Sequence, residues 1–243
     1  MYLAIDIGNT SQKLALFDQN GRQCQWLRKE RLTLEDLQQL FSQYPVRAAI
    51  LSSVGDEAAP LEEFLKARVP TYRLTSDLQL PVTLCYATPA SLGADRIASA
   101  AGAHALFPDC NVLVVQAGTC LVTDLVTAAG QYLGGTIAPG LRMRLRALPQ
   151  FTAHLPLLDP EPVNYLVGNS TTQSILSGVV NGYVCEIQGM ISRYETQYPG
   201  LKVVLSGGDA PLLESSLKNS IFAAQNLVLL GLYEILHFNV SKT

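Results

Sequence analysis

The sequence predicts an α/β protein built from two similar halves, because one succession of strands and turns occurs twice along the chain. In residues 2–17, two apolar runs flank a Gly-Asn-Thr turn, which is typical of two strands joined by a tight connection. The same succession returns in residues 112–126. A second pair of segments, 50–56 and 204–209, shares an apolar strand, a small-residue turn and a Gly-Asp that opens a helix. Such internal repeats indicate that one structural unit is duplicated.

Local signals place the individual elements. Thr33 precedes an amphipathic stretch and is a suitable helix N-cap, and Asn20-Gly21 favours a hairpin turn. A boundary near Asp109–Asn111 would divide the chain into an N-terminal half, residues 1–110, and a C-terminal half, residues 111–243. The expected strands are residues 2–7, 14–17, 48–52, 112–115 and 121–126, and the expected helices are 34–41, a segment after Gly55-Asp56, and 93–107.

Composition indicates a folded protein and argues against several functions. Apolar residues make up 48% of the 243 residues and charged residues 15%, which is enough apolar material for a core and too little charge for disorder. The 17 basic and 20 acidic side chains give a net charge of −3, so the chain lacks the basic balance of a nucleic-acid binder. The five cysteines show no CxxC spacing and the three histidines are scattered, which favours reduced thiols and no zinc site.

The N-terminus and the apolar runs predict a cytoplasmic protein that does not enter a membrane. Asp6 precedes the first basic residue, Lys13, which is the wrong order for a signal peptide. No apolar run approaches the ~18 residues that a membrane-spanning helix needs.

The first hairpin carries groups that suit phosphate. The backbone N–H groups of Asn9 and Thr10, with the hydroxyls of Thr10 and Ser11, can donate to phosphate oxygens, and Lys13 adds a positive charge. Asp6, at the end of a buried strand, can hold a magnesium ion through water. The same residues also fit an ordinary β-turn. No Walker A motif occurs in the chain, which argues against a P-loop enzyme.

The second hairpin repeats this chemistry with one difference. Thr119 takes the place of Thr10, but Gln116 takes that of Asp6. Asp124 lies in an otherwise apolar strand, where a charge needs a partner. It either touches metal or substrate, or it is a strand-end acid that accepts backbone hydrogen bonds; both interpretations stay open.

A helix that opens with Gly93-Ala94-Asp95-Arg96 offers a candidate proton acceptor. Asp95 falls in the first helical turn, where the helix dipole favours the carboxylate form. An aspartate is a weak base, but phosphoryl transfer depends mainly on positioning and on charge stabilisation. Arg96 can bind a carboxylate or a phosphoryl oxygen. The alternative is an ordinary N-terminal helix acid beside a solvated arginine.

Two glycine-rich segments follow. Gly134–Gly140 predicts a strand-to-helix turn, and the next helix would carry Arg142 and Arg146 on one face with Arg144 elsewhere. A solvated basic face explains these arginines equally well, so their roles stay open. Gly207-Gly208, after a strand, fits close approach to an adenosine or ordinary helix packing.

Taken together, the motifs resemble those of the type III pantothenate kinases over essentially the whole chain. That family has the duplicated actin-like, or ribonuclease H-like, ATPase fold of actin, sugar kinases and Hsp70, in which two similar halves with mixed sheets hold nucleotide in the cleft between them. The motifs occur in the order Asp-Ile-Gly-Asn-Thr at 6–10, Gly-Ala-Asp-Arg at 93–96, Gly-Thr…Thr-Asp at 118–124, Gly-Gly-Thr-Ile-Ala-Pro-Gly at 134–140, Asn-Ser-Thr at 169–171 with Ser-Gly at 177–178, and Ser-Gly-Gly-Asp-Ala at 206–210.

The resemblance implies that ATP phosphorylates the primary hydroxyl of pantothenate to give 4'-phosphopantothenate, the first step towards coenzyme A. Asp95 matches the family's proton acceptor, and Asp6 would hold Mg²⁺ or another divalent cation. The residues that would hold ATP phosphates are Asp6, Ile7, Gly8, Asn9, Thr10, Ser11, Gln12, Lys13 and Thr119, and those matching pantothenate contacts are Tyr86, Gly93, Ala94, Asp95, Arg96 and Thr171.

The family is dimeric, so the resemblance also implies a homodimer with the substrate pocket near the subunit interface. The apolar helical stretch 174–194 is a plausible dimer surface, and an internal core helix is an equal alternative.

The chain departs from the family pattern at two positions. Many members have an aspartate at the position of Gln116, where it binds K⁺ or NH₄⁺, and a neutral amide is a poorer cation ligand; a monovalent cofactor is therefore doubtful here. Thr88 stands where asparagine is common.

Two rival functions remain beside the kinase. One is a non-catalytic regulatory relative, which the presence of Asp6, Asp95, Arg96 and Thr119 argues against. The other is a kinase for another small hydroxylated metabolite, against which Tyr86 and Thr171 argue only through the resemblance.

Overall fold

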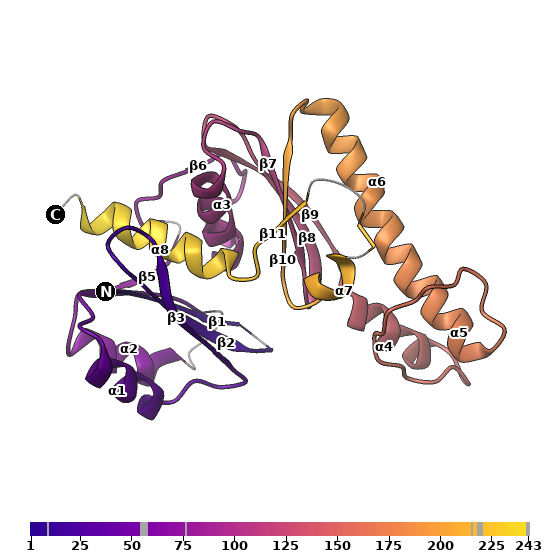
Figure 1. Ribbon diagram of the computed structural model, residues 1–243, viewed down its shortest axis with the longest axis horizontal. Helices are drawn as coiled ribbons and strands as arrows, with labels where there is room; N and C mark the ends of the chain where they lie inside the picture. Colours follow the sequence, from indigo (N-terminus) through magenta and orange to yellow (C-terminus); the bar gives the residue numbers. More distant parts are fainter. Residues whose placement is uncertain (9, 54–57, 76, 215, 218–220, 242–243) are drawn as a thin grey trace. The chain divides into compact units, whose positions relative to one another are not determined.

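Two sheets with the same strand plan form the framework of the protein (Figure 1). The computed structural model describes residues 1–8, 10–53, 58–75, 77–214, 216–217 and 221–241. It divides into two compact units. The first comprises residues 1–108, 130–132 and the chain from Asn226 onward, and the second comprises 109–129 and 133–225. The break after Pro108 lies near the expected boundary, but residues 130–132 and the C-terminal segment belong to the first unit. The division into halves 1–110 and 111–243 stays a prediction.

The first sheet has the order β3-β2-β1-β4-β5. Its central strand β1 is antiparallel to β2 and parallel to β4. The hairpin expected from the first glycine turn is therefore confirmed. The strands are β1 (Tyr2–Ile7), β2 (Gln12–Phe17), β3 (Gln23–Lys29), β4 (Ala48–Ser53) and β5 (Thr71–Arg73).

The second sheet has the order β11-β10-β7-β8-β9-β6. Its central strand β7 is antiparallel to β8 and parallel to β10, as β1 is to β2 and β4. Read from β9 to β11, the sheet repeats the first one strand for strand, which confirms the predicted duplicated α/β fold. The strands are β6 (Thr83–Leu84), β7 (Val112–Ala117), β8 (Cys120–Val126), β9 (Gln131–Pro139), β10 (Lys202–Ser206) and β11 (Ile221–Ala223). The short β6 pairs with the first two residues of β9, which belong to the first unit.

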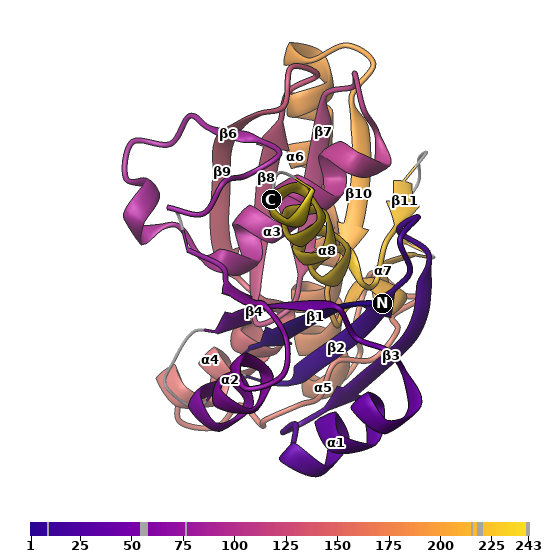
Figure 2. The ribbon, with the colours of Figure 1, turned by 90° about the vertical axis from the view of Figure 1, so that its left-hand side faces the viewer.

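Helices cover both faces of the first sheet (Figure 2). Side chains alternate along a strand, so β1 presents Leu3 and Ile5 to one face and Tyr2 to the other. The Leu3 and Ile5 face packs with α1 and α2 in one apolar cluster. On the opposite face, Tyr233 stacks on Phe17 with ring centroids 4.7 Å apart. The α-helices among the described residues of the first unit are α1 (Leu34–Gln43), α2 (Ala59–Lys66), α3 (Ala94–Leu106) and α8 (Leu227–Val240), and a 3₁₀ turn covers Pro89–Ser91.

Two of these helices start as the sequence predicts. Thr33 caps α1 by accepting from the backbone N–H of Asp36, and the Asp36 carboxylate accepts in return from the Thr33 backbone, which completes a capping box. Helix α3 has Gly93 as its N-cap and Asp95 in its first turn. It packs closely against α8, the C-terminal helix.

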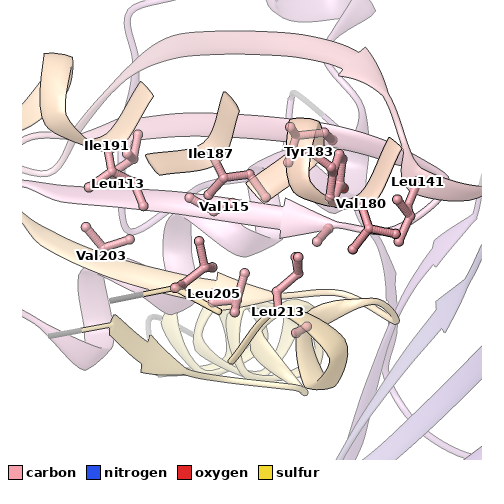
Figure 3. Close-up of a cluster of buried hydrophobic side chains, with 14 residues drawn as sticks. Leu113, Val115, Leu141, Val180, Tyr183, Ile187, Ile191, Val203, Leu205 and Leu213 are labelled. Atoms are coloured by element: carbon pink, nitrogen blue, oxygen red, sulfur yellow. The ribbon is translucent and has the colours of Figure 1, made fainter. Parts of the chain in front are cut away.

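The apolar core of the second unit lies between the sheet and α6 (Figure 3). Tyr183, Ile187 and Ile191 follow one another at helical spacing and face Leu113 and Val115 of β7. These three positions of the stretch 174–194 are thus internal. The helices of this unit are α4 (Leu141–Phe151), α5 (Thr171–Leu176), a π-helical segment (Ser177–Asn181), α6 (Gly182–Gln197) and α7 (Ala210–Glu214).

One local prediction is wrong. The segment expected to be a glycine-rich turn, Gly134–Gly140, continues strand β9 as far as Pro139, and α4 begins at Leu141. The physical reason lies at Gly135, where an added Cβ would overlap the backbone carbonyl of Thr123 on β8. The glycine serves close approach of two strands and not a turn.

Among the residues that the structure describes, no helix combines the length and the apolar character needed to cross a membrane.

Candidate active site

The carboxylate of Asp6 lies at the centre of the first sheet, near the carboxyl end of β1. Strand register places Lys13 of β2 and Ser52 of β4 on either side of it. Residues opposite each other in a sheet project to the same face, so the three side chains share one surface. The Ser52 hydroxyl donates to Asp6 Oδ1 at 2.8 Å. Ser52 is not among the site residues that the sequence predicted. It is the counterpart of Ser206 in the repeated strand, and that correspondence is the signal that could have revealed it.

The surroundings of Asp6 shift its protonation. Burial raises the pKa of the Asp6 carboxyl above its ordinary value. The Ser52 hydrogen bond and the Lys13 charge lower that pKa again, while the negative charge of Asp95 raises it. Asp6 and Asp95 are far apart in the chain, yet they interact electrostatically within one unit.

Asp95 is exposed at the start of α3. Its Oδ1 lies 2.6 Å from the point where a Cβ on Gly93 would stand, so the N-cap glycine leaves room for the carboxylate. Ala94 is the first residue of the helix and is half-buried. An exposed, ionisable carboxylate fixed on a rigid helix is suited to accept a proton from a bound hydroxyl.

Arg96 is buried beside two aromatic rings. Its guanidinium carbon is 5.7 Å from the ring centre of Tyr86 and 5.9 Å from that of Tyr132. The two rings are 6.0 Å apart, and the Tyr132 carbonyl accepts from the backbone N–H of Cys85 at 2.9 Å. Tyr132 therefore contacts both Tyr86 and Arg96, but nothing in its local sequence indicated this.

The remaining residues of the first hairpin differ in what they can offer a phosphate. Ile7 is buried in the apolar core, so only its backbone is available. The Gln12 side chain is also buried, and its oxygen accepts from the backbone N–H of Leu32 at 2.7 Å. Thr10 is exposed, whereas Gly8 and Ser11 are half-buried. The predicted contact at Asn9 lies outside the described residues.

The second hairpin has different neighbours at the matching position. Gln116 is flanked by Val122 of β8 and Ser206 of β10, where Asp6 has Lys13 and Ser52. Thr119 is exposed at the hairpin tip, and its carbonyl accepts from the backbone N–H of Gly140 at 3.2 Å.

Asp124 lies inside β8 and is fully buried. It stands two residues before the end of the strand, so it is not a strand-end acid, and its role stays open. Arg142 forms an ion pair with Asp159 at 3.2 Å. On the same helix, Arg144 is turned towards α6 while Arg146 is exposed.

A pocket of about 820 Å³ lies in the second unit at the start of α5. Thr171, a predicted pantothenate contact, lines it together with Ser170, whose hydroxyl caps α5 by accepting from the Gln173 N–H at 3.3 Å. The π-helical segment holds the preceding loop: Ser177 Oγ donates to the Leu166 carbonyl at 2.6 Å, and Asn181 Nδ2 donates to the Tyr165 carbonyl at 3.0 Å. The other lining residues are Leu148, Leu155, Gly168, Asn169, Ser174, Ile175, Gly178 and Val179.

The predicted residues are thus divided between the two units. Asp6, Lys13 and Asp95 lie in the first unit, with Tyr86 and Arg96. Thr119 and Thr171 lie in the second.

The donor set around Asp6 suits Mg²⁺ better than a transition metal. Among the described residues, no group of three or more His, Cys, Asp or Glu side chains is placed to hold a metal ion. Mg²⁺ is commonly bound through one or two carboxylates, substrate phosphates and water, and does not require a cage of protein ligands. A lone, oriented carboxylate such as Asp6 fits that requirement.

Comparisons with known proteins identify the family of this chain and the fold that it shares. The sequence model of the type III pantothenate kinases matches residues 2–193. A type III pantothenate kinase of Christiangramia forsetii is 44% identical over 246 aligned residues, covering all of both chains. Among solved structures, a Baf family protein of Campylobacter jejuni superposes with a TM-score of 0.63 at 18% identity, covering 98% of this chain and 99% of that one. A ROK family protein of Streptococcus pneumoniae gives 0.55 at 14% identity, covering 99% of each chain. The chain belongs to the type III pantothenate kinase family.

Proposed function

We propose that this protein transfers the γ-phosphoryl group of ATP to the primary hydroxyl of pantothenate, giving 4'-phosphopantothenate and ADP, the first step of coenzyme A biosynthesis. Membership of the family supports the substrate pair. The observation that carries the proposal is the pair of acids in the first unit: Asp6 is buried and held by Ser52, while Asp95 is exposed at the start of α3 and acts on Asp6 electrostatically.

The two acids are suited to different tasks. Asp95 would accept the hydroxyl proton of pantothenate as that oxygen forms its bond to the γ-phosphorus and the bond from phosphorus to ADP breaks. Asp6 would hold a Mg²⁺ ion that accompanies ATP and supplies charge neutralisation for the phosphates. The first hairpin, with Thr10, Ser11 and Lys13, would bind phosphate oxygens, and Thr119 would do so from the second.

Arg96 would anchor the carboxylate of pantothenate. It is the one arginine of the Gly93–Arg96 segment, and two aromatic rings restrict its side chain. Planar guanidinium groups bind carboxylates through two parallel hydrogen bonds, which fixes the orientation of the ligand as well as its position. Tyr86 and Thr171 would contact the rest of the substrate.

We also propose that the protein acts as a homodimer. The second unit exposes large apolar side chains close in sequence to the Thr171 pocket, with Phe151, Leu166 and Val167 each exposed by 80% or more. A second copy of the chain would cover them. The inner face of α6, by contrast, is already buried in the core. Light scattering on the purified protein should give twice the monomer mass, and Val167→Glu should shift it towards monomer; a monomeric wild-type protein would refute this proposal.

The kinase proposal is tested with purified protein, ATP, Mg²⁺ and pantothenate, with ADP release coupled to NADH oxidation and phosphopantothenate identified by mass spectrometry. The assay is run with and without K⁺ or NH₄⁺. Omission of pantothenate gives the background ATPase rate, and an N-acetylated amino sugar serves as the competing acceptor. If no phosphopantothenate forms with any of these cations, the proposed activity is wrong.

A further inference from the structure

Arg144 of α4 makes three contacts that tie separate elements of the second unit together. Its Nε donates to the Pro139 carbonyl at 2.8 Å, and its Nη1 lies 2.6 Å from Glu186 Oε2 on α6. Its guanidinium carbon also sits 4.9 Å from the ring centre of Tyr183. The side chain is 23% exposed, which distinguishes it from Arg142 on the same helix, at 59%.

The ring beneath Arg144 is a fixed support. Tyr183 is fully buried in the core of the second unit (Figure 3). Burial raises the pKa of its hydroxyl, so the ring stays neutral at physiological pH. A cation over the face of a buried aromatic ring is attracted by the ring quadrupole. Tyr183 and Glu186 together therefore fix the direction of the Arg144 guanidinium.

The fixed guanidinium holds a peptide that also touches the second hairpin. The Pro139 carbonyl and the Gly140 N–H belong to the same peptide unit, which is planar and rigid. Its oxygen accepts from Arg144, and its N–H donates to the Thr119 carbonyl at 3.2 Å. The backbone is tightly packed at this point, because a Cβ on Gly140 would overlap the carbonyl oxygens of Gly118 and Thr119. A displacement of this peptide is therefore passed directly to the hairpin tip.

We propose that Arg144 is a positioning residue for ATP. It acts on Thr119 through the 139–140 peptide, because its Nε donates to the Pro139 carbonyl while its Nη1 pairs with Glu186. The inference rests on the proposed function, in which Thr119 binds ATP phosphates. Glu186 and Tyr183 orient Arg144 and contribute through it.

The experiment compares Arg144→Gln with Arg146→Gln, an arginine of the same helix that is exposed. Dissociation constants for a non-hydrolysable Mg-ATP analogue are measured by calorimetry, and KM for ATP, KM for pantothenate and kcat by the coupled assay. Arg144→Gln should weaken analogue binding and raise KM for ATP by about 10- to 100-fold, the range for loss of a charge-assisted hydrogen bond. In Arg144→Gln, KM for pantothenate should stay near the wild-type value. In Arg146→Gln, analogue binding and both KM values should stay near those of the wild type.

Two further variants separate positioning from stability. Arg144→Lys keeps the positive charge for Glu186 but lacks the Nε group that meets Pro139, so it should retain the melting temperature better than Arg144→Gln yet still bind the analogue weakly. Glu186→Gln keeps the arginine and should give a smaller loss of binding. It also serves as the test if Arg144→Gln does not fold.

Several results would overturn the inference. One is unchanged analogue binding in Arg144→Gln or, if that protein does not fold, in Glu186→Gln. Another is an equal loss of analogue binding in Arg146→Gln. A third is a rise in KM for pantothenate as large as the rise in KM for ATP. Full rescue by Arg144→Lys would also contradict it. Because calorimetry needs no turnover, a wild-type protein that binds the analogue but does not phosphorylate pantothenate would refute the proposed substrate and leave this inference testable.

Discussion

The two glycine hairpins share one strand plan but are held in different ways. In the first, the next-to-last residue of the strand before the glycine is a carboxylate, Asp6, with a lysine and a serine beside it. In the second, the corresponding residue is the neutral Gln116, beside a valine and a serine, and the hairpin tip is fastened by backbone contact with Gly140. The two hairpins thus share the strand plan and the serine, whereas at these matching positions the charged groups occur in the first hairpin alone.

This difference indicates a division of labour. The first unit contains the acids that interact with each other, Asp6 and Asp95, together with Arg96. The second unit supplies the neutral Gln116 and the exposed Thr119, and Arg144 donates to the peptide whose N–H contacts the Thr119 carbonyl. Four predictions would break or sharpen this comparison, and they are taken from the largest expected effect to the smallest.

Asp95→Asn should lower kcat by about 10²- to 10⁴-fold, because an amide cannot accept the hydroxyl proton. The side chain is exposed, so circular dichroism and binding of a Mg-ATP analogue should remain close to wild type. Turnover in the coupled assay is the measurement. Retention of most activity would show that Asp95 is not the proton acceptor.

Asp6→Asn should lower kcat by roughly 10²- to 10³-fold, the range for loss of a preorganised electrostatic group. Binding of Mn²⁺ in the presence of the nucleotide analogue, followed by electron paramagnetic resonance, should weaken in parallel. Gln116→Met removes the polar group from the matching position and should lose only a small part of the activity. Equal losses in the two variants would contradict the division of labour.

Gln116→Asp places a carboxylate in the second hairpin where the first has one. Carboxylate oxygens are better ligands for hard cations than a neutral amide. We expect a several-fold stimulation of kcat by K⁺ over Na⁺ in this variant and less in the wild type. The measurement is the initial rate at matched ionic strength, with Gln116→Glu as the length control. Equal stimulation in wild type would mean that the amide already serves a monovalent cation.

The Asp6 carboxylate should lower the stability of the folded protein as the pH rises. The pKa of Asp6 in the folded protein lies above its ordinary value of 3.8, so the folded state binds the proton more tightly than the unfolded state. Its contribution to the free energy of unfolding is therefore fully present below that ordinary value and is lost as the pH rises through the higher pKa of the folded state. Asp6→Asn, which cannot ionise, should gain melting temperature relative to wild type as the pH increases from 4 to 8. A constant or shrinking difference would contradict the raised pKa.

Local sequence signals predicted elements whose causes are themselves local. The capping box at Thr33 and the first turn of α3 depend on neighbouring residues, and both appear as expected. The repeat of apolar run, glycine and apolar run predicted both hairpins, because alternation and tight turns are properties of short segments. The prediction of a turn at the glycine-rich segment 134–140 is wrong for the opposite reason. Whether a glycine marks a turn or the close approach of two strands depends on the neighbouring strand, here at Thr123.

The site shows the same limit. Asp6, Asp95 and Thr119 could be chosen as candidates from their motifs. No motif indicated that Ser52 contacts Asp6, that Tyr132 contacts Tyr86 or that Arg144 pairs with Glu186, because the members of each pair lie far apart along the chain. The π-helical segment is a similar case, since Ser177 and Asn181 make their hydrogen bonds to a loop more than ten residues earlier.

The sequence by itself determined the duplicated α/β plan, the two hairpins, the helix-start aspartate and the family. Each of these is written in short segments or in their order. Only the tertiary structure decided that the C-terminal helix α8 joins the first unit, that Ser52 orients Asp6, and that one rigid peptide links Arg144 to Thr119. These relations arise from packing and from hydrogen bonds between distant segments, and the spacing of residues along a chain does not encode which distant groups will meet.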